Sequence, residues 1–282
     1  MLIAKTIAEV RGAVAKLRAE RRCIGLVPTM GALHAVHLSL VRAAKAQCDA
    51  VVATIFVNPT QFAPEEDFAM YPRTFEADCA ALEAEGVDLL FAPEAAEMYP
   101  ADASTVVEVE EISDRLDGVS RPGHFRGVAT VVAKLFNIVQ PNHAFFGQKD
   151  AAQVAVLRRM VRDLNFGLEL VVCPTVREPD GLAMSSRNRY LSAEERQQAL
   201  VLSRALRRVS EEIEAGVVVS QPLIDVALGV LANEPEVRLD YFRIVDPETL
   251  EDIEDVSAGA LVAVAAVVGP TRLIDNVVIQ PR

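Results

Sequence analysis

Residues 23–37 read CIGLVPTMGALHAVH, and this stretch sets the predicted architecture. Its apolar start is typical of a buried strand, Gly31 marks a tight turn, and the remainder opens a helix. His34 and His37 stand three residues apart, so both rings share one helix face near the N-terminus. A helix N-terminus presents backbone N–H groups and a positive dipole end to an anion. The stretch therefore predicts a phosphate-binding site in an α/β sheet.

Strand-like runs alternate with helical patterns over the first 175 residues. Several runs are apolar throughout, which is expected when helices cover both faces of a parallel sheet. The predicted strands are residues 23–27, 50–57, 88–92, 105–109, 144–146 and 168–172. The predicted helices are residues 6–22, 38–47, 74–85, 128–139 and 151–164. These repeating units predict a Rossmann-like, doubly wound parallel sheet with ligands at the carboxyl ends of its strands.

The pattern changes near residues 174–179, where two prolines flank a polar segment. Two helical patterns follow, at about 193–215 and 221–233, and then two strand patterns at 237–245 and 260–268. The last of these is apolar enough to be a central strand. We therefore expect two domains, a doubly wound domain over residues 1–175 and a smaller α+β domain over residues 176–282.

The composition excludes several classes of protein. A formal charge of −12 argues against non-specific binding of nucleic acid or anionic membranes, so an anionic substrate needs a local basic site. No apolar run is long enough for a membrane span, and the N-terminus lacks a signal-peptide layout, so we expect a cytoplasmic protein. The four cysteines lie far apart without a CxxC pair, which argues against a disulfide framework or a zinc site, and Cys23 and Cys173 lie in apolar runs that predict buried thiols.

Two segments carry candidate phosphate-binding groups. Met184-Ser185-Ser186-Arg187 combines two hydroxyls with a guanidinium, although it is also compatible with a polar loop capping the helix that starts near Ser192. Gly147-Gln148-Lys149-Asp150 follows a strand and precedes a helix. There Lys149 suits a β- or γ-phosphate, and Asp150 is either part of the site or an N-cap. Gln153, one turn later, faces the same side.

Common alternatives lack their motifs. Neither a Walker A loop nor GxGxxG is present, and no HExxH or nearby Cys/Asp cluster completes a zinc site at the histidines. Residues 65–67, EED, predict a solvated helix start rather than a metal site.

The segment Asn58-Pro59-Thr60-Gln61 ends an apolar strand, because proline cannot donate to a central ladder. The Gln61 amide both donates and accepts hydrogen bonds, which suits a substrate with a hydroxyl and a carboxylate, unless it is a turn residue in solvent. Residues 71–73 and 120–127 form basic loops in this acidic chain, which suit either anionic ligands or surface ion pairs.

Together these motifs resemble the pantothenate synthetase (pantoate–β-alanine ligase) family, of the adenylate-forming and nucleotidylyltransferase group with an HxGH signature. The resemblance extends over nearly the whole chain. Its segments are VPTMGALH..H (27–37), IFVNPTQF (55–62), YPRT (71–74), SRPGHFRGV (120–128), KLFN (134–137), FGQKD (146–150), GLAMSSRN (181–188) and RLIDN (272–276).

This resemblance implies a two-step reaction. The carboxylate of pantoate attacks the α-phosphorus of ATP to give pantoyl adenylate and pyrophosphate, and the amine of β-alanine then displaces AMP to give pantothenate. Mg²⁺ enters on the ATP phosphates without protein ligands. The resemblance also implies a homodimer, in which residues 105–109 are an edge strand either at the interface or within one subunit.

The resemblance also assigns roles to residues. It makes His37 the general acid, with His34 assisting, and places Lys149 on the β/γ-phosphates. Gln61 and Gln153 hold pantoate, and Gln61 also faces β-alanine. Val176 meets the adenine through its backbone, and residues 184–187 close over the triphosphate from the second domain. The implied ATP-binding set is Met30, Gly31, Ala32, Leu33, His34, Ala35, Val36, His37, Gly147, Gln148, Lys149, Asp150, Val176, Met184, Ser185, Ser186 and Arg187.

One departure concerns the HxGH signature, which here reads His34-Ala35-Val36-His37. The usual glycine lets a nucleotide approach the helix backbone, and Val36 adds a branched side chain there. Overpacking of ~1–3 kcal/mol predicts an ATP affinity roughly 5- to 150-fold lower. A catalytically impaired or silent homologue is therefore one alternative, and a nucleotidylyltransferase that keeps the nucleotide on its product is another. Release of AMP distinguishes the ligase from the latter, and the acidic charge disfavours a tRNA synthetase.

Overall fold

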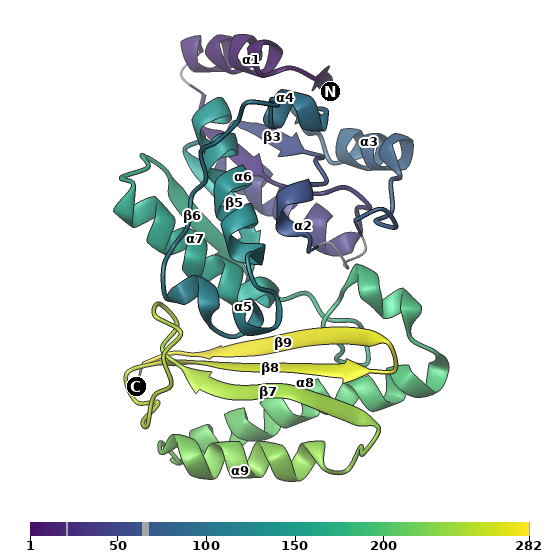
Figure 1. Ribbon diagram of the computed structural model, residues 1–282, viewed down its shortest axis with the longest axis vertical. Coiled ribbons are helices and arrows are strands. Elements are labelled where there is room, and N and C mark those ends of the chain that lie inside the picture. The colour runs from purple at the N-terminus through teal and green to yellow at the C-terminus, as the bar shows by residue number, and fades with distance from the viewer. Residues whose placement is uncertain (21, 64–67, 282) are drawn as a thin grey trace. The chain divides into compact units, whose positions relative to one another are not determined.

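The computed structural model describes residues 1–20, 22–63 and 68–281 (Figure 1). The acidic segment 65–67 lies outside the described residues. The chain divides into two compact units, each with its own sheet. Unit 1 comprises residues 1–114, 118–147 and 156–173, and unit 2 comprises residues 115–117, 148–155 and 174–282.

The described residues of unit 1 form a six-stranded sheet in the order β1-β4-β3-β2-β5-β6, with every pair parallel. Its strands are β1 (Leu2–Ala4), β2 (Ile24–Val27), β3 (Ala50–Thr54), β4 (Leu89–Phe91), β5 (His143–Gly147) and β6 (Glu169–Cys173). Strands β2, β3 and β4 are buried throughout, as expected for a sheet covered on both faces. The predicted doubly wound α/β fold is confirmed.

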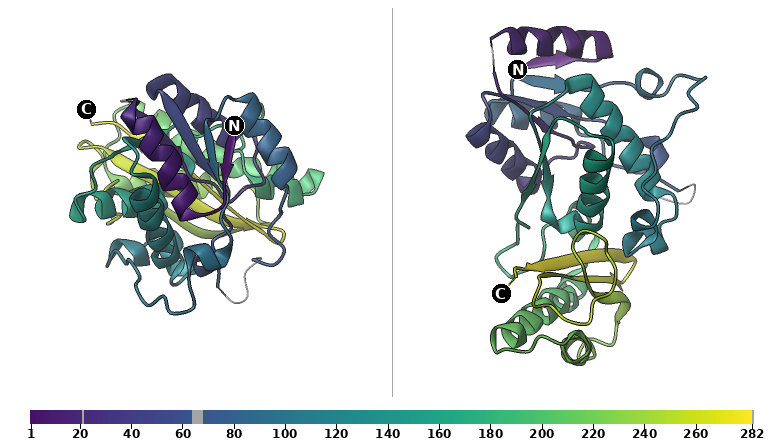
Figure 2. Two further views of the ribbon diagram at one scale, coloured as in Figure 1. Left: turned by 90° about the horizontal axis from the view of Figure 1, so that it is seen from above. Right: turned by 90° about the vertical axis from the view of Figure 1, so that its left-hand side faces the viewer.

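Helices cover this sheet on both sides (Figure 2). The long ones are α1 (Ile7–Ala19), α2 (Ala35–Gln47), α3 (Phe75–Ala84), α6 (His124–Val139) and α7 (Ala151–Asp163). In the strand order, the connection from β1 to β2 runs toward β6, whereas the connections from β2 to β3 and from β3 to β4 run back toward β1. Right-handed crossovers therefore place α1 on one face and α2 and α3 on the other. The direction reverses between β2 and β5, and ligands bind at such a switch point in doubly wound sheets.

Short elements join these layers. They are the α-helices α4 (Ala95–Met98) and α5 (Asp117–Ser120) and the 3₁₀ turns η1 (Pro59–Gln61), η2 (Ile112–Asp114) and η3 (Gln148–Asp150). Among the described residues, no helix is both long enough and apolar enough to cross a membrane.

The strand predicted at residues 105–109 is wrong, because these residues form no strand. Instead of pairing with a neighbouring strand, the backbone N–H and carbonyl of Val107 form hydrogen bonds with the Thr130 side chain on α6. The Val107 N–H donates to Thr130 Oγ1 at 2.9 Å, and the Thr130 hydroxyl donates to the Val107 carbonyl at 3.3 Å. An edge-strand interface at this segment is therefore withdrawn.

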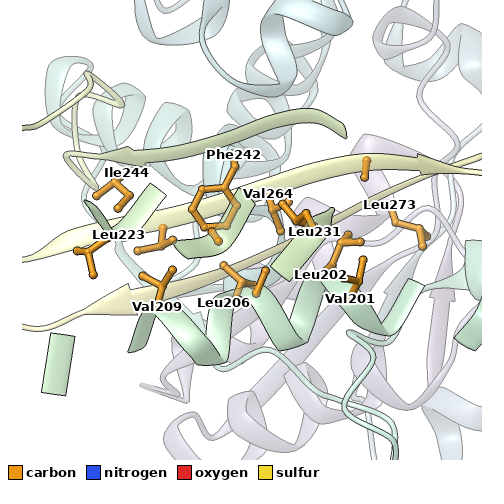
Figure 3. Packing of buried hydrophobic residues seen from close by; sticks show 14 of the residues in the cluster. Val201, Leu202, Leu206, Val209, Leu223, Leu231, Phe242, Ile244, Val264 and Leu273 are labelled. Atoms are coloured by element: carbon orange, nitrogen blue, oxygen red, sulfur yellow. The ribbon is translucent and has the colours of Figure 1, made fainter. Parts of the chain in front are cut away.

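Unit 2 holds an antiparallel sheet of three strands within the described residues, in the order β7 (Val237–Val245), β8 (Ala260–Val268) and β9 (Thr271–Ile279). The strand predicted at 260–268 is central, as its apolar sequence indicates. Helices α8 (Ala193–Glu214) and α9 (Ser220–Leu231) pack apolar faces against this sheet, with Leu206 and Val209 opposite Phe242 (Figure 3). The turn η4 (Ser186–Tyr190) precedes α8.

Candidate active site

The turn after β2 is anchored by a buried carboxylate. The backbone N–H groups of Ala32 and Leu33 donate to Asp78 Oδ2 and Oδ1 at 2.9 and 2.8 Å, and the Thr74 hydroxyl donates to the same carboxylate at 3.1 Å. Asp78, on α3, is only 3% exposed. Several bonds to one buried anion fix the backbone of the turn directly before α2. Sequence analysis missed Asp78, since an acid in the first turn of a helix is ordinary.

Gly31 forms the predicted tight turn, with a φ of +85°. A Cβ there would lie 3.1 Å from both Asp78 Oδ2 and Ile55 Cγ2. Glycine is therefore required by conformation and by space. Upstream, the Thr29 N–H donates to the Thr54 hydroxyl at 3.1 Å, which ties the end of β2 to the end of β3.

His34 and His37 lie together at the start of α2, with ring centroids 4.3 Å apart. His34 is the N-cap residue, and its backbone N–H donates to Nδ1 of His37 at 3.3 Å. Because Nδ1 accepts this bond, the neutral His37 ring carries its proton on Nε2. In the neutral ring, Nε2 of His37 is therefore the hydrogen-bond donor.

The two residues between the histidines differ in exposure. Ala35 is exposed, whereas Val36 is half-buried in the first turn of α2. The Val36 carbonyl accepts a hydrogen bond from the Ser39 hydroxyl at 2.7 Å, so its backbone is part of a regular helix start. The branched side chain therefore stands in the helix turn where the HxGH pattern has glycine.

Gln61 is held beside the same turn. Its Nε2 lies 3.1 Å from the Met30 sulfur, and its Oε1 accepts from Asn58 Nδ2 at 3.1 Å. Asn58 is 1% exposed and also donates to the Gly127 carbonyl and accepts from the Tyr99 hydroxyl. Burial raises the pKa of Tyr99, so it stays a neutral donor. Met30 and Gln61 therefore lie side by side, and Gln61 is held by the buried Asn58, whose role the sequence did not reveal.

The basic loop at residues 120–127 supports this arrangement. Nδ1 of His124 lies 2.8 Å from the Gln61 carbonyl oxygen, and its Nε2 lies 3.0 Å from Arg121 Nη1. A carbonyl only accepts and a guanidinium only donates, so both bonds form with the Nδ1–H tautomer. His124 therefore fixes the backbone of Gln61. In the other basic loop, Arg73 donates to carbonyls of its own loop.

In unit 2, Asn276 fixes the segment after β5. Its Nδ2 donates to the backbone carbonyls of Gln148 and Lys149 at 3.1 and 2.9 Å, and its Oδ1 accepts from Gln148 Nε2 at 3.1 Å. Asn276 is 4% exposed. The side chains of Lys149 and Gln153 are half-buried, and Asp150 is exposed. The motif RLIDN, residues 272–276, includes Asn276, but the sequence does not show that Asn276 contacts η3.

Val176 lies beside a bidentate ion pair. Its carbonyl accepts from the Met184 N–H at 2.9 Å. The neighbouring Arg177 forms two hydrogen bonds, of 2.7 and 3.0 Å, with Asp275, which is 3% exposed. This pair joins the strand β9 to the segment that carries Val176 and Met184.

The serine pair begins the turn η4. Ser185 Oγ accepts from the Arg187 N–H at 3.2 Å, while the Arg187 side chain is exposed. Helix α8 is capped by Ser192 and Glu195 in a capping box, so residues 184–187 are not needed for that purpose. Asn188, a buried residue of η4, donates a hydrogen bond to the Glu178 carboxylate. Glu178 in turn forms an ion pair with Arg196.

The residues predicted to bind ATP, together with Gln61 and Gln153 predicted to bind pantoate, are divided between the two units. Unit 1 contains residues 30–37, Gln61 and Gly147, the last residue of β5. Unit 2 contains residues 148–150, Gln153, Val176 and residues 184–187. Within unit 1, β2 and β5 are neighbours, so the turn after β2 and Gly147 lie at the carboxyl ends of adjacent strands.

Known proteins resemble the chain over its whole length. The pantoate-beta-alanine ligase family matches residues 2–278. A pantothenate synthetase of Acidobacterium capsulatum is 67% identical, covering 98% of this chain and 96% of its own, and that of Koribacter versatilis is 59% identical, covering 99% and 96%.

Solved structures agree with these sequence matches. The crystal structure of pantothenate synthetase from Thermus thermophilus has 50% identity and a TM-score of 0.93, with 100% of both chains covered. A pantoate-beta-alanine ligase from Francisella tularensis, complexed with beta-gamma ATP and beta-alanine, has 34% identity and a TM-score of 0.81, covering 98% of this chain and 97% of its own. The chain therefore belongs to the pantoate–β-alanine ligase family, and it is a ligase.

Proposed function

We propose that this ligase condenses pantoate with β-alanine through a pantoyl-adenylate intermediate, releasing pyrophosphate and AMP. The observation that carries the proposal is the paired histidine rings at the start of α2, directly after a turn held by Asp78. Gln61, beside Met30 of the same turn, supplies a neighbouring amide. The Francisella relative, complexed with beta-gamma ATP and beta-alanine, supports the assignment of ATP and β-alanine.

In the first step, the pantoate carboxylate attacks the α-phosphorus, and the bond to pyrophosphate breaks. We assign His37 as the general acid, with His34 assisting. The neutral ring, whose Nδ1 accepts from His34 N–H, can stabilise developing negative charge on the phosphates through its Nε2–H. To give up a proton the ring must be an imidazolium, in which Nδ1 is protonated and this backbone bond is lost. The N-terminus of α2 adds its dipole to the same stabilisation. Without activation the carboxylate is a poor electrophile, because oxide is a poor leaving group.

In the second step, the amine of β-alanine attacks the acyl carbon, and the bond between that carbon and the AMP oxygen breaks. We assign Gln61 and Gln153 to the pantoate, with Gln61 also facing β-alanine. The support for Gln61 is its fixed position, since Asn58 holds its side chain and His124 its backbone carbonyl. A preorganised amide loses little freedom when it binds substrate.

Unit 2 supplies the remaining phosphate contacts in this proposal. Lys149 faces the β- and γ-phosphates, the Val176 backbone contacts the adenine, and residues 184–187 close over the triphosphate. The exposed guanidinium of Arg187 and the half-buried Lys149 have the charge that this role requires. Closure of residues 176–282 as a lid would keep water from an acyl adenylate, which hydrolyses readily.

Mg²⁺ is proposed to enter with ATP, where it would neutralise charge on the phosphates and on the pyrophosphate that leaves, without ligands from the protein. This fits the two imidazoles at the start of α2, because Mg²⁺ prefers oxygen ligands and retains waters. The protein's groups then hold the phosphates rather than the ion.

A homodimer and a cytoplasmic location complete the proposal, and both rest on the family. Four free thiols suit a reducing compartment. Size-exclusion chromatography with light scattering would show a mass near twice 30.6 kDa for the dimer.

Val36 favours a second candidate, a homologue whose ATP site is impaired. The test for both is product formation by the purified protein with ATP, Mg²⁺ and pantoate, with and without β-alanine. Stoichiometric AMP and pyrophosphate, formed in turnover only when both co-substrates are present, support the ligase. With β-alanine present, sustained formation of pyrophosphate without AMP indicates nucleotidyl transfer. Binding of pantoate without either product indicates the impaired homologue.

A further inference from the structure

Two thiols and an imidazole meet far from the proposed active site. Ligand atoms of Cys23, Cys48 and His143 all lie within 4.8 Å of one another, although the residues are widely separated in sequence. Cys23 directly precedes β2, Cys48 precedes β3 and His143 begins β5. The three strands are parallel neighbours, so the cluster lies at their amino ends. The turn that carries His37 follows the opposite end of β2.

The backbone holds the two cysteines in place. The Cys23 carbonyl accepts hydrogen bonds from the N–H groups of Asp49 and Ala50, both at 3.0 Å, and the Cys23 N–H donates to Asp49 Oδ2 at 2.7 Å. Cys48 ends α2, where its N–H donates to the Ala44 carbonyl at 2.8 Å. The relative position of the two thiols is thus fixed by the framework of the sheet and not by flexible loops.

Gly25 leaves room for the Cys48 thiol. In the sheet register Gly25 on β2 pairs with His143 on β5. A Cβ at Gly25 would lie 3.0 Å from the Cys48 sulfur, so the thiol lies directly over this glycine. A larger residue would therefore push Cys48 away from its neighbours.

The imidazole has an unused nitrogen. Within the described part of the chain, Nδ1 of His143 is buried and has no hydrogen-bond partner, and the nearest carboxylate oxygen, Glu169 Oε2, lies 3.5 Å away. A buried polar atom without a partner is destabilising, and such atoms in folded proteins often point to an ion or water. The His143 side chain is 26% exposed, which leaves a route for an ion to enter.

We propose that Cys23, Cys48 and His143 form a structural binding site for a soft divalent cation, for which Zn²⁺ is the best match. Two sulfurs and one imidazole nitrogen are a common zinc donor set, whereas Mg²⁺ and Ca²⁺ require oxygen. Tetrahedral Zn²⁺ holds sulfur at about 2.3 Å and nitrogen at about 2.0 Å, so the ligand atoms, which lie within 4.8 Å of one another, would move closer together when the ion binds. Glu169 or water completes the coordination.

The Cys48 thiol is neutral in the absence of the ion. Burial and a hydrogen bond with Cys23 raise the pKa of Cys48 to about 12. Binding of Zn²⁺ therefore releases a proton from this thiol. The ion would link residue 23 to residues 48 and 143 and thereby stabilise the amino ends of three strands. The proposal is independent of the proposed function, because the cluster and the His37 turn lie at opposite ends of β2.

The test uses the full chain, kept reduced with a phosphine. Zn²⁺ is titrated against a chromophoric chelator, and Co²⁺ replaces it for absorption spectroscopy. We expect one ion per chain, a thiolate-to-cobalt charge-transfer band, and a higher Tm with Zn²⁺. Cys23→Ala and Cys48→Ala should each lower the affinity by at least ~100-fold, more than the loss of an outer-shell partner does.

Cys173→Ala is the matched control, because Cys173 is another buried thiol of unit 1 outside the cluster. It should retain full Zn²⁺ affinity and the cobalt band. His143→Gln, at the partly exposed edge, tests the site if a cysteine variant misfolds, and it should also lose at least ~100-fold. The proposal is overturned if the reduced wild type neither competes for Zn²⁺ nor shows the cobalt band. It is equally overturned if the variants at 23, 48 and 143 bind like the control.

Discussion

The backbone N–H of His34 donates to Nδ1 of His37 at 3.3 Å, and this contact determines which nitrogen of His37 faces outward as a donor. The bond links the N-cap of α2 to its third residue, so the ring orientation follows from the helix start itself. A second residue, Asp78, fixes the preceding turn. The catalytic role proposed for His37 thus depends on local backbone geometry.

His37 is tested by two replacements. Glutamine restores an N–H near the Nε2 position but has no transferable proton, whereas asparagine retains only an acceptor near Nδ1. If His37 is the general acid, kcat falls by ~10²–10⁴-fold in both variants. Gln47→Ala, exposed at the other end of α2, is the control and should leave kcat unchanged. Near wild-type kcat for His37→Gln would contradict the acid role.

Asp78→Asn should weaken the turn, because an amide can accept only on one side where the carboxylate accepts on both. Loss of one buried hydrogen bond to a charged group lowers the free energy of unfolding by about 1.5–3 kcal/mol. The KM for ATP should rise as well. Denaturant unfolding and initial rates measure the two effects, with exposed Glu76→Gln on the same helix as control. An unchanged KM would show that the turn does not bind ATP.

Val36→Gly tests the departure from HxGH. Removing the branched side chain relieves ~1–3 kcal/mol of overpacking, so the KM for ATP should fall roughly 5- to 150-fold. Ala35→Gly is the control, because it also introduces a glycine into the first turn of α2 but removes no branched side chain. It should not lower the KM for ATP. Equal KM values for Val36→Gly and wild type would show that this valine is tolerated.

Gly127→Ala should disturb Gln61 through the backbone. A Cβ at Gly127 would lie 2.3 Å from the Thr60 carbonyl oxygen, so α6 and η1 must separate. We expect a loss of about 3 kcal/mol in unfolding free energy and a higher KM for pantoate. Gly229→Ala, with open space around its Cβ in α9, should instead stabilise by about 0.4–1 kcal/mol. Stability unchanged by Gly127→Ala would contradict the close approach.

Arg196→Met should reduce stability in a pH-dependent way. The hydrogen bond from Arg196 lowers the pKa of Glu178 below its ordinary value in the folded state. This contribution is complete above the unfolded-state pKa of about 4.3 and is lost as the pH falls through the lower folded value. The difference in unfolding free energy between wild type and variant should therefore shrink below about pH 4. Exposed Arg207→Met should show no such change, and a constant difference for Arg196→Met would contradict the assignment.

Much of the fold follows from periodicity. The runs at 50–57 and 260–268 are apolar, and they contain β3 and the central strand β8, whose residues are buried almost throughout. Strand β1 was missed because three residues, two of them exposed, carry no readable pattern. Residues 105–109 look like a strand, but the Thr130 side chain satisfies Val107 in place of a ladder. Tertiary contacts decide such cases.

The candidate site divides in a similar way. Glycine, histidine and serine motifs are visible in sequence because their spacing reflects local geometry, as at Gly31 and His37. The residues that hold these motifs in place are not visible in the sequence, because Asp78 and Asn276 bond to residues far away along the chain. The same limit applies to Cys23 and Cys48, which lack a local zinc spacing and meet only because β2 and β3 are neighbours.

The most direct test of the central claim is the fate of the carboxylate oxygen of pantoate. Pantoate labelled with oxygen-18 in its carboxylate is incubated with the protein, ATP, Mg²⁺ and β-alanine, and the products are analysed by mass spectrometry. Attack on the α-phosphorus followed by cleavage of the acyl bond predicts one labelled oxygen in AMP and none in pyrophosphate. Label in inorganic phosphate, with ADP as the nucleotide product, would contradict the account.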